Sequence, residues 1–99
     1  MIHSRESTPR EIFEFCEGYQ KFAADVPLVV VPTTYNKVTE EELAKHGVRV
    51  VIYANHLIRS AFPAMMKTAR AILKNNRAYE AESFCMSLKD ILTLIPGGD

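Results

Sequence analysis

Apolar side chains near the start of the chain recur at the spacing of a helix with one buried face. Thr8 and Glu11 match a capping box ahead of this pattern, and Pro9 suits the first helical position. We therefore expect a helix that begins beside Thr8 and ends at residues 25–27. Its apolar positions are Ile12, Phe13, Phe15, Cys16, Tyr19, Phe22 and Ala23.

Two runs then predict buried strands, an uninterrupted apolar run at residues 28–31 and a largely apolar run at residues 48–54. A half-exposed strand would alternate apolar and polar residues, whereas a continuous run is typical of a parallel sheet covered on both faces. Between the runs, Thr39 and Glu42 form a second capping box. A short helix should follow as far as His46, with Gly47 as its left-handed cap.

The second half of the chain has the pattern of helices. Residues 57–75 are amphipathic and contain Pro63, so we expect a break or kink just before this proline. A shorter helix is expected at residues 78–86. Ser87 then starts a last helix, which continues through residues 91–95, and residues 96–99 form a tail.

Alternating buried strands and helices indicate βαβ units around a parallel sheet. If Met1 and Ile2 end a strand, the chain holds about two and a half such units. A (β/α)8 barrel needs roughly 250 residues, so 99 residues cannot close one. We therefore expect one partial α/β domain over residues 1–99. It would be the C-terminal third of a barrel, with about strands 6–8 and their helices.

Composition narrows the class of protein further. Twelve basic and twelve acidic residues balance, so charge gives no argument for a nucleic-acid partner or a membrane surface. The N-terminus lacks the apolar core of a signal peptide, and no stretch is long enough to span a bilayer. We expect a soluble cytoplasmic protein. Cys16 and Cys85 are interpreted as small buried apolar residues rather than a disulfide.

Polar side chains follow each predicted strand, at His3-Ser4, at residues 33–36 and at Asn55-His56. Active sites of (β/α)8 barrels lie at these strand ends, although loops are polar in any protein and the plain interpretation stays open. No Asp or Glu stands at a strand end, so the chain offers no evident Mg²⁺ ligands. It also lacks a glycine-rich phosphate loop. The pattern predicts binding of an anion or polar substrate rather than its conversion.

Three strings carry a resemblance to a known family. They are MIHSR, LVVVPTTYNKVTEEELAKHGVRVVIYANHLIRSAFPAM and SLKDILTLIPG, and they cover nearly the whole chain. In order and spacing they resemble the C-terminal part of the phosphoenolpyruvate mutase family, within the isocitrate lyase superfamily. The resemblance implies a Mg²⁺-dependent (β/α)8 barrel that interconverts phosphoenolpyruvate and phosphonopyruvate, the entry step to phosphonates. It also implies homo-oligomers formed by swapping the eighth helix.

The resemblance implies roles for four residues as substrate-binding candidates. His3 matches the histidine of the M-x-H-S motif, which contacts the migrating phosphoryl group. Thr33 matches a strand-end position that contacts substrate in the wider superfamily. Asn55 and His56 match the family's A-N-H motif, as supports of neighbouring loops or as direct contacts. His46 should instead be a helix C-terminal residue, and Arg59 either pairs with a carboxylate or is solvated.

The family's Mg²⁺ carboxylates, gating loop and phosphoryl-binding arginine all fall upstream of this segment. We therefore expect the parent enzyme to be an isomerase that uses Mg²⁺, and the isolated chain to be inactive. A phosphonopyruvate hydrolase with the same barrel, or another lyase of the superfamily, is an alternative. A second alternative is a non-catalytic small α/β interaction module, which should bury Phe13, Tyr19, Phe22, Ile72 and Leu73.

Overall fold

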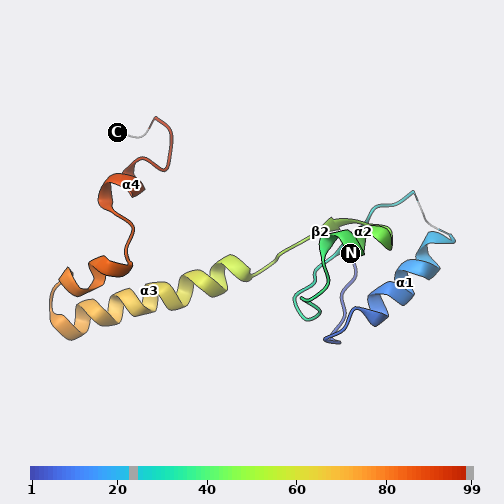
Figure 1. The fold of residues 1–99 in the computed structure, drawn as a ribbon, viewed down its shortest axis with the longest axis horizontal. Helices are drawn as coiled ribbons and strands as arrows, with labels where there is room; N and C mark the ends of the chain where they lie inside the picture. The colour runs from blue at the N-terminus through green and yellow to red at the C-terminus, as the bar shows by residue number, and fades with distance from the viewer. Residues whose placement is uncertain (23–24, 98–99) are drawn as a thin grey trace. The chain divides into compact units, whose positions relative to one another are not determined.

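A two-stranded parallel sheet with two helices forms the first part of the molecule, and helices alone form the second (Figure 1). The computed structural model describes residues 1–22 and 25–97. These divide into two units, one of residues 1–55 and one that begins at His56. The elements are α1 (Arg10–Gln20), β1 (Leu28–Val30), α2 (Glu40–Lys45), β2 (Val48–Val51), α3 (His56–Asn75), the 3-10 helix η1 (Tyr79–Phe84) and α4 (Leu88–Leu92).

β1 lies in the middle of three parallel segments. Its residues pair in parallel with β2, and Val30 also forms an isolated parallel bridge with Ile2. Successive carbonyls of a strand point to opposite edges. Accordingly, Val29 O accepts from the Ile2 N–H at 2.9 Å, while Val30 O accepts from the Ile52 N–H at 2.9 Å. The predicted α/β class with parallel strands is confirmed, while Ile2 forms an isolated bridge rather than part of a strand. The numbering of these strands within a barrel stays a prediction.

The core of the first unit joins both helices to the sheet. Its buried side chains are Ile12, Cys16, Leu28, Val30, Tyr35, Leu43 and Val48. Cys16 is completely buried, as predicted, and burial raises the pKa of its thiol. Cys85 is exposed, so the prediction of a second buried cysteine is wrong. Cys85 is the C-cap of η1. Among the described residues of the second unit, Ala81 is the only one that is buried.

The capping box predicted at Thr8 is wrong. Pro9 is the N-cap of α1 and no side chain caps the helix. The Glu11 carboxylate, which should have reached back to the cap, instead accepts a hydrogen bond from the Ser4 hydroxyl. The apolar face is only partly buried, since Phe22 stays 78% exposed. Ala23 lies outside the described residues.

The capping box at α2 is confirmed. The Glu42 N–H donates to Thr39 Oγ1 at 3.2 Å, and the Thr39 N–H donates to the Glu42 carboxylate at 3.1 Å. Gly47 follows with a φ of 93°, a conformation that glycine adopts without strain. A Cβ at this position would also meet the Gln20 side chain, whose amide donates to His46 O at 2.8 Å. α1 is thereby docked on the turn between α2 and β2.

β2 is shorter and more exposed than its sequence predicts. It ends at Val51 rather than residue 54, and Arg49 and Val50 are exposed. The expectation of a strand covered on both faces is therefore wrong. α2 packs against β2, but a helix of six residues covers only part of the strand.

α3 runs from His56 to Asn75 with Pro63 inside it, so a break before this proline is wrong, and a kink there stays a prediction. A proline inside a helix removes one backbone hydrogen bond, and here the helix continues through it. Asn76, with a φ of 53°, ends α3 as predicted. η1 replaces the helix expected at residues 78–86. α4 begins after Ser87 as predicted, but ends at Leu92.

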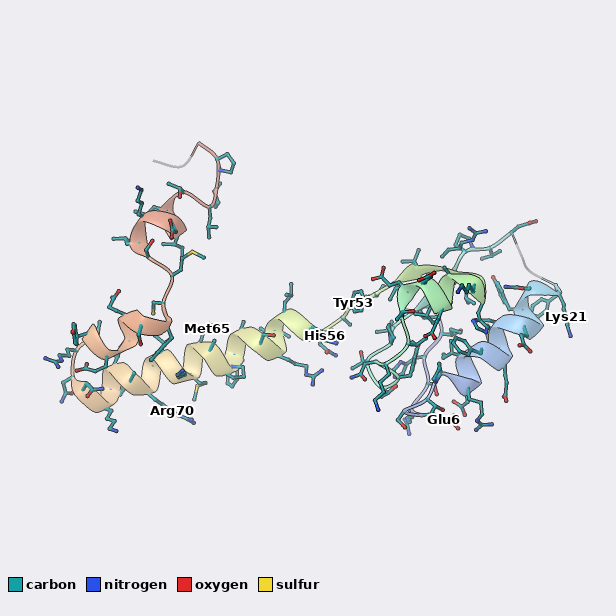
Figure 2. All side chains as sticks on the ribbon, in the orientation of Figure 1. Glu6, Lys21, Tyr53, His56, Met65 and Arg70 are labelled. Atoms are coloured by element: carbon teal, nitrogen blue, oxygen red, sulfur yellow. The ribbon has the colours of Figure 1, made fainter. Side chains whose placement is uncertain are left out.

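Apolar side chains of the second unit stay largely exposed. No residue of α3 is buried, and Leu73 is 77% exposed. Figure 2 shows side chains standing off α3 on several sides, including the labelled Met65 and Arg70, with η1 beside the C-terminal half of the helix. Despite this apolar surface, none of the helices in the described ranges is long and apolar enough to cross a membrane.

Candidate functional site at the strand ends

A hollow of about 600 Å³ lies where the three parallel segments of the first unit end. Eight residues line it, namely Met1, His3, Val31, Thr33, Thr34, Ile52, Ala54 and Asn55. The fold thus brings three of the predicted site residues, His3, Thr33 and Asn55, to one place. His56, the fourth, is the first residue of α3 in the second unit and is not among the lining residues.

The backbone carbonyl of Val31 organises two of these residues. It accepts a hydrogen bond from the His3 ring at Nδ1, at 3.2 Å, and another from the Thr33 N–H, at 2.9 Å. A carbonyl oxygen can only accept, so this contact assigns the ring proton to Nδ1. Nε2 is then the ring atom left for a ligand. It accepts a hydrogen bond when the ring is neutral and donates one when the ring is protonated.

The Thr34 side chain bonds a backbone carbonyl, which the sequence did not indicate. Its hydroxyl donates to Ser4 O at 2.6 Å, which joins the loop after β1 to the segment after His3. The Thr33 hydroxyl makes no such hydrogen bond with a described residue. Of the two neighbouring threonines, Thr34 is therefore the one whose side chain bonds the backbone. Sequence reasoning missed Ser4, Thr34 and Glu11 as parts of the site's framework. The polar Ser4 next to His3 was the available signal.

Tyr35 packs beside His3 as part of the core. The two ring centroids are 6.4 Å apart, and Tyr35 is completely buried. Its hydroxyl has no hydrogen-bond partner among the described residues. Burial raises the pKa of Tyr35, and Cys16 raises it further. The Val31 backbone acts in the opposite direction and lowers it. An ionised phenol is disfavoured here, so Tyr35 supports the site by packing rather than by charge.

Among the described residues that line the hollow there is no Lys, Arg, Asp or Glu. Its polar groups are hydroxyls, an amide and an imidazole, which suit hydrogen bonds to an anionic or polar ligand. Mg²⁺ prefers carboxylates and water. No group of three His, Cys, Asp or Glu side chains within residues 1–22 and 25–97 could hold a metal ion. The described residues therefore do not form a magnesium site by themselves.

A second pocket, of about 530 Å³, lies between α3 and η1. Its lining is mostly apolar, and Lys67 Nζ stands 4.4 Å from the centroid of the Phe84 ring. Without polar groups that converge on one point, this pocket lacks the means to orient a reactive substrate. We therefore take the strand-end hollow as the candidate functional site.

His46 has the structural role predicted for it. It is the C-cap of α2, its Nδ1 contacts Glu42 O at 2.9 Å, and its ring stacks on Phe13 with centroids 3.7 Å apart. Arg59 lies on the exposed part of α3, in the second unit. Neither residue lines the strand-end hollow.

The parallel strands and the polar side chains at their ends define an α/β protein with a candidate binding site at one edge of the sheet. The sequence model of the family described as phosphoenolpyruvate phosphomutase matches residues 1–73. The chain therefore belongs to the phosphoenolpyruvate phosphomutase family.

Individual relatives agree with this family. The chain is 38% identical to phosphonopyruvate hydrolase from Variovorax sp. (strain Pal2), over 95% of the chain and 32% of that protein. It is 35% identical to phosphoenolpyruvate phosphomutase from Streptomyces viridochromogenes, over 95% of the chain and 29% of that protein. The chain thus spans about a third of the length of these relatives.

Solved structures show the same partial match. The crystal structure of phosphoenolpyruvate phosphomutase from Streptomyces platensis subsp. rosaceus matches with a TM-score of 0.79 and 33% identity, over 92% of the chain and 31% of that structure. A structure of phosphonopyruvate hydrolase in complex with oxalate and Mg²⁺ matches with a TM-score of 0.76 and 38% identity, over 92% of the chain and 31% of that structure.

Proposed function

We propose that these residues are the C-terminal segment of a phosphoenolpyruvate mutase, which interconverts phosphoenolpyruvate and phosphonopyruvate. The segment would supply about strands 6–8 of a (β/α)8 barrel and their helices. The observation that carries the proposal is the convergence of His3, Thr33 and Asn55 on one hollow at the strand ends, in a chain that matches this family over most of its length.

His3 is the residue we propose to contact the phosphoryl group. With Nδ1 bonded to Val31 O, a protonated ring donates from Nε2 to a phosphoryl oxygen. The Thr33 hydroxyl and the Asn55 amide supply further polar contacts to the same anion. Transfer of a phosphoryl group depends on positioning and on neutralising charge. No Lys or Arg is found among the described lining residues, so we expect most of that neutralisation to come from groups outside this segment.

Mg²⁺ and a small carboxylate substrate belong to the same proposal. The related hydrolase structure is a complex with oxalate and Mg²⁺, which supports a metal-dependent site for small organic acids in the whole protein. A bound Mg²⁺ would neutralise negative charge on the substrate. The described residues lack its carboxylate ligands, and so we expect the isolated chain to have no mutase activity. Turnover of phosphonopyruvate by this chain alone with Mg²⁺, followed by ³¹P NMR, would contradict this.

The role of His3 is tested in the longer protein that carries this segment. His3→Ala should lower kcat/KM roughly 100-fold or more, because it removes a preorganised donor to developing charge. His46→Gln is the matched control, since His46 lies outside the hollow and should leave kcat/KM near the original value. Near-normal turnover of the His3→Ala protein would remove His3 from the mechanism.

Phosphonopyruvate hydrolase is the second candidate, because a hydrolase is 38% identical to the chain. The VPTTYN and ANH strings favour the mutase. The products distinguish the two reactions. A mutase converts phosphonopyruvate to phosphoenolpyruvate, whereas a hydrolase releases inorganic phosphate and pyruvate. Both products are resolved by ³¹P NMR of one reaction mixture.

A self-contained interaction module is the less favoured alternative. It should bury the apolar faces of its helices, and Phe13 and Tyr19 are indeed partly buried, but Phe22 is 78% and Leu73 77% exposed. Contiguous exposed apolar surface marks an interface with other protein. We propose that in the whole protein α3 is covered by other residues of the barrel or by a second subunit, which makes a homo-oligomer. Size-exclusion chromatography of the longer protein tests this, and a strict monomer would contradict the oligomer.

A further inference from the structure

Ser4 is buried, whereas His3, the residue before it, is exposed. Ser4 is 4% exposed, and it is the buried polar residue of the described part of the chain. His3, by contrast, is exposed. Packing alone therefore does not fix the direction of the His3 ring, and hydrogen bonds around it have to do so. Burying a hydroxyl is unfavourable unless its hydrogen bonds are made, which indicates a specific role for the contacts of Ser4.

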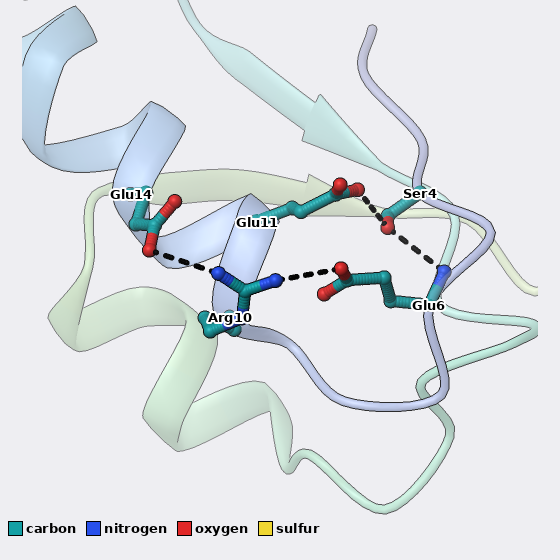
Figure 3. A network of polar contacts seen from close by, with 5 residues as sticks. All are labelled: Ser4, Glu6, Arg10, Glu11 and Glu14. Carbon is teal, nitrogen blue, oxygen red and sulfur yellow. Dashed lines mark hydrogen bonds and ion pairs between the residues drawn. The ribbon is translucent and has the colours of Figure 1, made fainter.

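The Ser4 hydroxyl uses both its donor and an acceptor position. It donates to Glu11 Oε2 at 2.6 Å and accepts from the Glu6 N–H at 3.1 Å (Figure 3). Glu11 lies in the first turn of α1, so the bond ties the segment after His3 to that helix. The neighbouring Arg10 is engaged by Glu6 and Glu14, at 2.7 and 3.6 Å, which leaves the Glu11 carboxylate to Ser4.

The backbone of Ser4 is held from a second direction. Thr34 Oγ1 donates to Ser4 O at 2.6 Å and connects it to the loop after β1. On the other side of His3, the Ile2 N–H donates to Val29 O at 2.9 Å. His3 thus lies between Ile2, whose backbone bonds β1, and Ser4, whose side chain bonds α1 and whose backbone bonds the loop after β1.

We propose that Ser4, Glu11 and Thr34 are positioning residues for His3, which hold its backbone where Nδ1 bonds Val31 O and Nε2 is presented to a ligand. The functional part of this inference rests on the proposed role of His3 as a phosphoryl contact. The structural part does not. Preorganisation of this kind saves the ordering of a mobile side chain when the ligand binds or reacts.

The structural part is tested on the 99-residue chain by ¹⁵N NMR of its histidine rings. We expect neutral His3 to carry its proton on Nδ1. Thr34→Val removes the hydroxyl at nearly constant shape and should shift His3 toward the tautomer mixture of free histidine, in which Nε2–H predominates. Ser4→Ala should act in the same direction. Thr34→Ser keeps the hydroxyl and should restore the Nδ1–H form.

Two controls separate positioning from a general loss of structure. Glu17→Gln removes a carboxylate from the same helix without touching Ser4 and should leave the His3 tautomer unchanged. His46 Nδ1 contacts Glu42 O, so its resonances report within each variant whether the α2 region stays folded. The inference is overturned if His3 of the original chain already shows the free mixture, as in an unfolded chain, or if Thr34→Val leaves its tautomer unchanged.

The functional part is tested in the longer protein. Thr34→Val should lower kcat about tenfold and Thr34→Ser much less, because misplacing a contacting group by about 1 Å can cost up to a hundredfold. If His3→Ala is inactive while Thr34→Val keeps both tautomer and rate, the positioning role falls and the proposed function stands. If the tautomer shifts while His3→Ala stays active, the proposed function falls and the positioning role stands.

Discussion

The two units of the chain differ in how they are held together. In the first, hydrogen bonds join residues far apart in sequence, such as Thr34 with Ser4 and Gln20 with His46. In the second, many side-chain hydrogen bonds join residues three or four positions apart, such as Ser60 with His56 and Thr68 with Ala64. The first unit has a core of seven buried residues, whereas α3 buries none. The candidate site therefore lies in the unit whose tertiary contacts can fix side chains in place.

The largest expected difference between the units concerns leucine. Leu43 is 1% exposed and Leu73 is 77% exposed. Leu43→Ala should lower the free energy of unfolding by about 2–5 kcal/mol, because it leaves a cavity in the core. Leu73→Ala should change it by less than about 0.5 kcal/mol. Urea unfolding followed by circular dichroism measures both, which suits a chain without tryptophan.

This pair of variants also tests whether α3 is covered in solution. If copies of the chain associate through α3, Leu73→Ala will weaken the assembly, and its effect will grow with protein concentration. Repeating the unfolding at two protein concentrations detects this. If Leu43→Ala and Leu73→Ala lowered the free energy of unfolding equally, the proposed difference between the two units would be wrong.

Helix caps give a smaller contrast. Thr39 caps α2 and Ser87 caps α4, each by accepting from a backbone N–H three residues later. Thr39→Ala should cost about 1 kcal/mol, since α2 contributes Leu43 to the core and unfolds with it. Ser87→Ala should leave the main unfolding transition in place, because no residue of α4 is buried. The midpoints of urea unfolding for the two variants decide between these outcomes.

The smallest expected effect concerns Tyr35, which carries a buried hydroxyl without a recorded partner. Burial raises the pKa of Tyr35 in the folded chain above the ordinary value of about 10. Its contribution to stability is therefore full below pH 10 and is lost as the pH rises through the folded-state pKa. Tyr35→Phe should change stability at pH 7 by less than about 0.5 kcal/mol and should weaken this alkaline loss.

The measurement is urea unfolding of both proteins between pH 8 and 11. Tyr79 is exposed, and Tyr79→Phe is the matched control in the second unit. It should leave the alkaline loss of stability as it was. A Tyr35→Phe protein with the same alkaline loss as the original chain would assign that loss to other groups.

Local signals in the sequence were predictive where the element depends on local contacts. The Thr39 capping box, the Gly47 cap and the Ser87 helix start all form as predicted. The similar pattern at Thr8 failed because the Glu11 carboxylate bonds Ser4, seven residues away, and the sequence gives no measure of that competition. The break expected at Pro63 does not occur, because one missing backbone hydrogen bond does not by itself end a helix of twenty residues.

The candidate site likewise has features that the sequence could predict and features that it could not. The positions of His3, Thr33 and Asn55 at one edge follow from strand ends in a parallel sheet, which the sequence could predict. Which threonine bonds the backbone could not be predicted, because Thr33 and Thr34 are identical in type and adjacent. Only the fold shows that Thr34 reaches Ser4 O. The roles of His3, Thr33, Asn55 and His56 toward substrate remain predictions.

The Val31 carbonyl, which bonds both His3 and Thr33, has a consequence for mutational tolerance. Every amino acid carries the same backbone oxygen, so no substitution at position 31 deletes the acceptor, provided that the strand keeps its path. The vulnerable positions are those of the donors. Proline at position 33 would remove the N–H, and any residue other than histidine at position 3 would remove the ring. The side chain at position 31 can therefore change in evolution while the hydrogen bonds from His3 and Thr33 to the backbone oxygen are kept.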